Sequence, residues 1–181
     1  MSERTADGRS QEQALIGRLQ QAPVFQCLAG RYLQVLRRIA RPRTLVSGAT
    51  VIEAGDAGPG LFILLKGTWA VGDSSDHVLE PISTAGEIAE LTEAPQALRI
   101  GAVEDSIALH IPHDVLSALF SRDADLHQRL CRNAIMDLSQ RLVASNSRLD
   151  RLGEERATLE TDLAAIEMEL NDARMLQSMR V

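Results

Sequence analysis

Hydrophobic and polar positions follow a helical spacing in the first part of the chain. Pro23 interrupts this pattern because a helix interior needs the amide hydrogen that proline lacks. The sequence therefore predicts a helical entry over residues 11–41, made of two helices joined by a turn, with the second ending before Pro42. The polar residues 1–10 are expected to form a disordered tail.

Short apolar clusters, separated by glycine, proline, aspartate and serine, fill residues 43–112. Short strands at close spacing with turn residues between them are typical of an antiparallel sandwich or roll. We therefore expect a jelly-roll-like antiparallel β-roll, with turns over 55–60 and 72–76. Ser83 and Thr84 are interpreted as turn residues.

The pattern after the β-roll is helical throughout, with a short helix over 113–120 and a long one over 123–180. A heptad that starts at Ile135 keeps its a and d positions apolar up to Ala173, except at Ser145 and Arg156. A single helix cannot bury such a seam, so the sequence predicts a coiled coil and a homodimer. The seam residues expected to dimerise are Ile135, Leu138, Leu142, Leu149, Leu152, Leu159, Leu163, Ile166 and Leu170.

Composition narrows the class of protein. Apolar residues make up 45% of the chain, and no apolar run approaches the ~20 residues of a membrane span. The N-terminal residues lack a signal-peptide core, so we expect a cytoplasmic protein without a membrane span. Cys27 and Cys131 are far apart and are expected to be reduced and buried, and neither they nor His110 with His113 make a metal-binding pattern.

Charge is unevenly distributed along the long helix. Residues 153–172 hold seven acids and one arginine, whereas residues 129–151 hold five arginines and two acids. In a parallel self-pair, two g–e pairs would join like charges, namely Glu155 with Glu160 and Asp162 with Glu167. An antiparallel or staggered pairing, or a basic partner protein, would suit these residues better. We therefore predict a protein partner for the acidic coil 153–172.

The order of the predicted elements resembles that of the cyclic nucleotide-binding domain family. This is the effector domain of catabolite-activator-type regulators and of cyclic-nucleotide-dependent kinases and channels. The similarity rests on glycine-spaced residues 48–56, which look like a first hairpin of the family, and on residues 61–71, which look like a strand pair. Residues 86–91 with Pro95 are similar to the phosphate-binding cassette. The resemblance implies an α+β fold over residues 11–122.

The resemblance also implies roles for the cassette residues. In the family, amides at a short helix N-terminus bind the cyclic phosphate, a carboxylate accepts the ribose hydroxyl, and an arginine neutralises the phosphate. On this basis the ligand-binding residues would be Gly86, Glu87, Ile88, Ala89, Gln96 and Ala97, with Glu87 at the ribose position. Gln96 stands at the arginine position. A neutral amide there cannot offset the charge of a partly buried phosphate, which leaves a deficit of roughly 2–4 kcal/mol in the binding free energy. Arg99 could substitute only if the strand register slips.

Other activities find little support in the sequence. About forty residues follow Leu138, which is too few for the winged helix-turn-helix of transcription factors in this family, and the tail is acidic. We therefore expect no binding to nucleic acid. No motif of a nucleophile, a metalloprotease or a phosphate-binding loop is present, so an enzyme is not expected.

Three functions stay open at this point. The first is a non-enzymatic regulatory or scaffold protein whose domain is degenerate in phosphate binding, needs no cofactor, and dimerises and docks partners through the coil. The second is a cyclic AMP or cyclic GMP sensor that signals through the coil. The third is a structural subunit of a larger assembly.

Overall fold

The computed structural model describes residues 12–72 and 77–178, so the predicted tail 1–10 and all but the first residue of the predicted turn 72–76 lie outside the described residues. Residues 12–19 are helical. The elements that follow are η1 (Pro23–Phe25), α2 (Gly30–Ile39), β1 (Arg41–Leu45), β2 (Thr50–Ile52), β3 (Leu61–Lys66), β4 (Trp69–Val71), β5 (Val78–Leu79), β6 (Thr84–Ala85), α3 (Glu87–Thr92), β7 (Ile100–Ala102), β8 (Ser106–Ile111), α4 (His113–Arg122) and α5 (Ala124–Ser178). The predicted α+β class and the antiparallel β-roll are confirmed.

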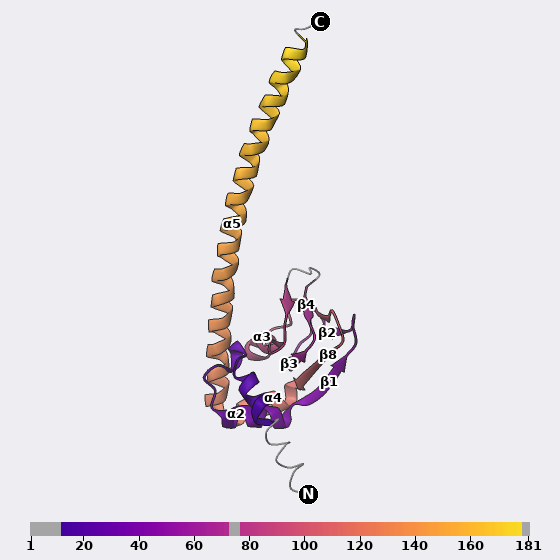
Figure 1. The fold of residues 1–181 in the computed structure, drawn as a ribbon. Helices are drawn as coiled ribbons and strands as arrows, with labels where there is room; N and C mark the ends of the chain where they lie inside the picture. The colour runs from indigo at the N-terminus through magenta and orange to yellow at the C-terminus, as the bar shows by residue number, and fades with distance from the viewer. Residues whose placement is uncertain (1–11, 73–76, 179–181) are drawn as a thin grey trace. The chain divides into compact units, whose positions relative to one another are not determined.

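The strands form two four-stranded antiparallel sheets (Figure 1). The strand order is β1-β8-β3-β6 in sheet A and β2-β7-β4-β5 in sheet B. The chain therefore changes sheet between β1 and β2, between β2 and β3, and again between β3 and β4. Residues 48–56 do not form a hairpin, because their strand β2 pairs with β7, and the strands of residues 61–71, β3 and β4, lie in different sheets. Among the described strands, β4 with β5 is the only pair of consecutive strands.

Strand β3 explains how the layers are held together. Its side chains alternate: Leu61 and Ile63 belong to a core between sheet A and the helices, whereas Phe62 and Leu64 belong to a core between the two sheets. A strand buried on both faces reads as a continuous apolar run. Sheet A is thus the middle layer, with sheet B on one face and helices on the other.

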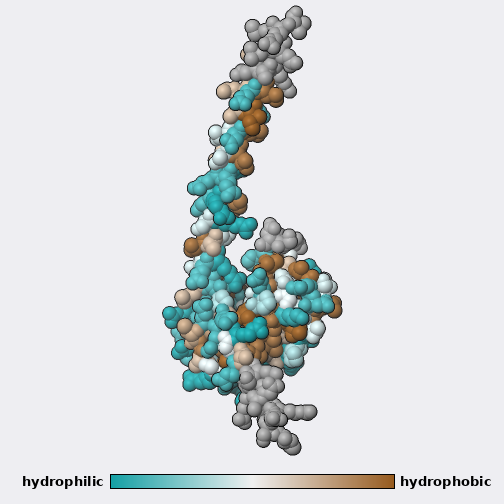
Figure 2. All heavy atoms as spheres, in the orientation of Figure 1, coloured by the Kyte–Doolittle hydropathy of each residue, from teal (hydrophilic) through white to brown (hydrophobic). Residues whose placement is uncertain are grey.

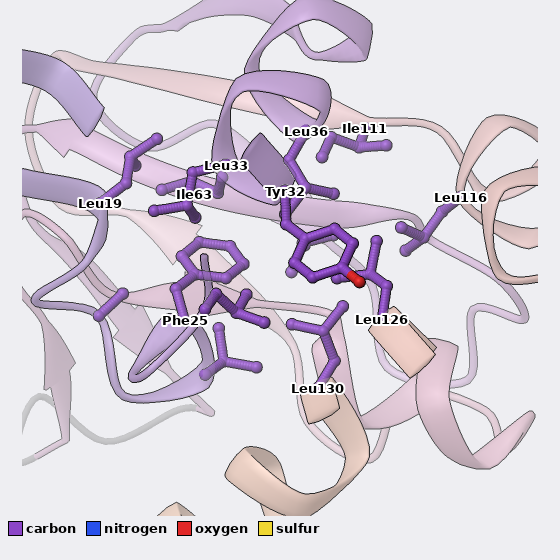
Figure 3. Close-up of a cluster of buried hydrophobic side chains, with 14 of the residues drawn as sticks. Leu19, Phe25, Tyr32, Leu33, Leu36, Ile63, Ile111, Leu116, Leu126 and Leu130 are labelled. Atoms are coloured by element: carbon purple, nitrogen blue, oxygen red, sulfur yellow. The ribbon is translucent and has the colours of Figure 1, made fainter. Parts of the chain in front are cut away.

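The helical core joins elements that are far apart in sequence (Figure 3). Phe25 from the entry segment, Leu33 from α2, Ile111 from β8 and Leu126 from α5 are all buried in it. Asn133 of α5 also donates hydrogen bonds to the carbonyl oxygens of residues 24 and 26, at 3.0 and 2.7 Å. The first turns of α5 are therefore part of the domain core.

Two local predictions were wrong. Thr84 lies in strand β6 and pairs with Ile63; a two-residue strand is too short to show a period in the sequence. Cys27 is exposed rather than buried, since it follows η1 at a turn where its φ is +58°. Cys131 is partly buried, and both thiols are free.

The chain divides into two compact units, of which the second begins at Leu138. In the second unit, the apolar a and d positions of α5 from Leu138 to Leu170 are exposed, from 44% at Leu138 to 68% at Leu159. Figure 2 shows hydrophobic residues recurring along this helix. Among the described residues no helix is both long and apolar enough to cross a membrane.

Candidate functional site

Gly86 joins strand β6 to helix α3 and fixes the start of the cassette. Its φ is +83°, in the left-handed region that favours glycine. A Cβ atom at this position would overlap the carbonyl oxygen of Gly60 and lie 3.3 Å from Ile52 Cδ1. Ile52 belongs to the core between the sheets. The start of α3 is therefore packed against the loop before β3 and borders the space between the sheets.

A buried carboxylate on α3 holds this loop in place. Glu90, with a side chain 2% exposed, accepts a hydrogen bond from the Gly60 amide at 2.6 Å and contacts His113 Nδ1 at 2.8 Å. One side chain thus ties α3 to the loop before β3 and to the start of α4. Sequence reasoning missed this linkage, because its three members are far apart along the chain and only the fold brings them together.

Of the predicted site residues, Gly86, Glu87, Ile88 and Ala89 lie together in the first turn of α3. Ala89 is buried, and Ile88 packs against the helical core. Glu87 is 9% exposed and lines an apolar crevice of about 10 Å³, whose other lining residues include Leu61 and Leu116. This crevice lies on the helical side of sheet A. The ribose role of Glu87 stays a prediction.

Gln96 and Ala97 lie in an irregular segment between α3 and β7. The Gln96 backbone pairs with the loop after β2: its amide donates to the Asp56 carbonyl and its carbonyl accepts from the Gly55 amide, both at 2.8 Å. Its side-chain amide donates to the Leu98 carbonyl at 3.0 Å, and Ala97 is exposed. The position that the resemblance assigns to an arginine is thus filled by a neutral amide bonded to its own segment.

Arg99 is the nearest cation after Gln96, and it points to the outer face of sheet B. Its Nη2 donates to Thr50 Oγ1 at 2.9 Å, and its Nε lies 3.8 Å from Glu53 Oε2. Thr50 pairs with Gly101, whose neighbours in β7 are buried between the sheets, so these two residues face outward. The register of β2 and β7 does shift between Thr50 and Ile52, but Arg99 still bonds to Thr50 on the outer face of sheet B.

His110 supports the same loop from strand β8. Its Nε2 lies 3.1 Å from the Pro59 carbonyl oxygen, and its ring stacks on Phe62 with centroids 4.1 Å apart. Burial lowers the pKa of His110 below its usual value, and Arg43 and Arg41 act in the same direction. His110 and His113 therefore have separate partners, and no group of three potential metal ligands occurs in the described part of the chain.

The lowered pKa of His110 predicts a pH dependence of stability. The folded state favours the neutral ring, so its contribution is complete above pH ~6.5 and is lost as the pH falls below that value. We expect the free energy of unfolding, measured in urea, to decrease between pH 7.5 and 5.5, and the His110→Gln variant to lose less over this range. Equal losses in both proteins would contradict the prediction.

Residues 42–123 match the family model described as the cyclic nucleotide-binding domain. No curated protein matches the chain. Among solved structures, the chain is similar to the catabolite activator protein of Thermus thermophilus, with 23% identity, a TM-score of 0.56, and coverage of 72% of this chain and 63% of that one. It is also similar to the regulatory domain of Toxoplasma gondii PKA with cAMP, with 23% identity, a TM-score of 0.54, and coverage of 60% and 44%.

A third similar structure is the N-terminal domain of a transcriptional regulator from Streptomyces coelicolor A3(2), with 22% identity, a TM-score of 0.57, and coverage of 68% of this chain and 93% of that one. The chain spans less than two thirds of the Thermus and Toxoplasma structures. At these identities the structures establish the fold, and the family assignment rests on the matched segment. Residues 42–123 are therefore assigned to the cyclic nucleotide-binding domain family.

Proposed function

We propose that this chain is a non-enzymatic regulatory or scaffold protein of the cytoplasm. Its cyclic nucleotide-binding domain would be degenerate in phosphate binding, and it would self-associate through the exposed seam of α5. The acidic stretch 153–172 would engage a basic protein surface. The matched family is one of binding domains, which is consistent with regulation rather than catalysis.

One observation carries this proposal: the cassette lacks the arginine of the family, and the nearby Arg99 bonds to residues outside the cassette. Gln96 is neutral, and the Arg99 guanidinium is held on the outer face of sheet B by Thr50 and Glu53. The cassette helix α3 itself carries Glu87 and Glu90 and no cation, so it adds no positive charge for a phosphate. The phosphate of a cyclic nucleotide would therefore find no arginine partner in this cassette.

A second candidate function is a cyclic nucleotide sensor that signals through α5. The observation in its favour is that Gly86 keeps the left-handed conformation and the first turn of α3 is formed. Calorimetric titration with cyclic AMP and with cyclic GMP separates the two candidates. The degenerate domain should give no binding at micromolar concentration, whereas tight binding of either nucleotide would overturn the proposal in favour of the sensor.

If the missing charge is the main deficit, Gln96→Arg should increase cyclic nucleotide affinity. We expect an improvement of tenfold or more, equivalent to about 1.4 kcal/mol. The matched control is Ala97→Arg, which adds the same charge at the next, exposed residue and should gain less. Binding that stays unmeasurable in a folded Gln96→Arg protein would mean that the pocket is closed for another reason.

A further inference from the structure

We propose that two copies of this chain pair their α5 helices in antiparallel orientation. The acidic half of one helix, residues 153–172, would lie against the arginine-rich half of the other. This inference rests on the self-association proposed above and identifies the basic surface that the acidic stretch engages. Its occupant is a second copy of the chain, and three features of α5 support it.

The first feature is where the exposed seam begins and ends. Leu126 and Leu130 are buried in the domain core, whereas every apolar seam position from Leu138 to Leu170 is exposed. In an antiparallel coiled coil, a positions of one helix face d positions of the other. A register that sets Leu138 opposite Leu170 of the second copy obeys this rule and overlaps the two seams from Leu138 to Leu170, which is all of the exposed seam except Ile135.

The second feature is the pair of polar residues inside the seam. In a parallel, in-register pair, Arg156 would face the second copy's Arg156, and Ser145 would face Ser145. Two buried guanidinium groups in one layer repel each other and lose hydration. In the antiparallel register Arg156 faces Leu152 and Ser145 faces Leu163, while Arg156 keeps its bond to Glu160 of its own helix at 2.7 Å. No layer then joins like charges.

The third feature is the charge at the g positions, which face each other across an antiparallel seam. Arg141 would lie opposite Glu169 of the second copy, and Arg148 opposite Asp162. By symmetry each attraction occurs twice in the dimer, and among the g positions the only like-charged pair is Glu155 with Glu155 at the centre. A parallel pair would instead place two acid–acid contacts on each side of the seam. Charge complementarity thus favours the antiparallel arrangement.

Single cysteines distinguish the two orientations. In a chain with Cys27 and Cys131 replaced by serine, Leu149→Cys and Leu159→Cys would be prepared separately, and both together by co-expression of the two chains. In the antiparallel register residue 149 faces residue 159, and two copies of residue 149 are ten residues, about 15 Å, apart along the helices. A disulfide needs Cα atoms within about 7 Å. Glu154→Cys, at an f position, is the control and should not cross-link in either orientation.

We expect mild oxidation to cross-link the co-expressed chains as a 149–159 heterodimer and to leave each single variant uncross-linked. Rapid homodimeric disulfides in both single variants would mean a parallel pair, and would overturn this inference while leaving the proposed self-association intact. A single-chain mass of the wild-type protein in light scattering would overturn both.

A charge exchange gives a second readout that keeps the seam residues unchanged. The variants Arg141→Glu with Arg148→Glu, and Asp162→Arg with Glu169→Arg, each set like charges opposite each other in the antiparallel register. We expect each variant alone to dimerise at least about tenfold more weakly than the wild type, and their mixture to recover the affinity because all four pairs become complementary. A mixture no tighter than the separate variants would overturn the antiparallel arrangement.

Discussion

Replacement of Leu159 and Leu163 by aspartate is expected to convert the self-associated protein into single chains at micromolar concentration. Both side chains are exposed in the isolated chain, at 68% and 57%, so the change leaves the fold of one chain unaffected. In a coiled coil the same positions are buried, and an unpaired carboxylate buried among leucines costs several kcal/mol. Light scattering before and after the substitution measures the effect.

The matched control for this experiment is Met168→Asp. Met168 is as exposed as Leu159, at 67%, but it occupies an f position that faces away from the seam in either orientation. We expect it to keep the mass of the wild type. If Met168→Asp dissociated the protein as well, α5 would self-associate through a face other than the heptad seam.

The second large effect is expected from Gly86→Ala. A residue with a side chain at φ +83° is strained by about 1–2 kcal/mol, and the new Cβ would also overlap the Gly60 carbonyl oxygen. Backbone atoms cannot move aside without displacing the loop that Glu90 holds. We expect a loss of at least about 3 kcal/mol in the free energy of unfolding. Urea denaturation measures it.

Gly48 offers a control that separates strain from overlap. Its φ is also +83°, but no atom lies within 4 Å of the position of an added Cβ. Gly48→Ala should therefore lower the free energy of unfolding only by the conformational strain, about 1–2 kcal/mol. Equal losses in the two variants would mean that the contact between Gly86 and the Gly60 loop is not tight.

The sequence was sufficient to predict the longer strands, though not the two-residue strand β6 and not which strands pair. The apolar run from Leu61 to Leu65 predicts a buried strand, and its position in the chain is correct. Which strand lies beside it depends on contacts with β8, more than forty residues later, and no local pattern encodes them. The turn residues near Gly55 suggested a hairpin. In the structure they lie where the chain crosses from one sheet to the other, and the same residue types suit both kinds of turn.

In the candidate site, too, some features could be predicted from the sequence and others could not. The spacing of Gly86, Glu87 and Pro95 could be recognised along the chain, since the cassette is one continuous segment. The partners of Arg99 could not, because Thr50 and Glu53 lie more than forty residues earlier and only the fold brings them to its guanidinium group. The role of Glu90 was also hidden, since in the sequence it is one more acid, and only the fold brings Gly60 and His113 to its two oxygens.

The position of the single tryptophan has a practical consequence for optical measurements. Trp69 is fully buried in the core between the sheets, where its Nε1 donates to Ser106 Oγ at 2.9 Å. Its fluorescence therefore reports only on the β-roll, whereas far-ultraviolet circular dichroism is dominated by helix, much of it in the 55 residues of α5. Heating the protein while both signals are recorded would show directly whether roll and long helix melt as one cooperative unit or in two steps.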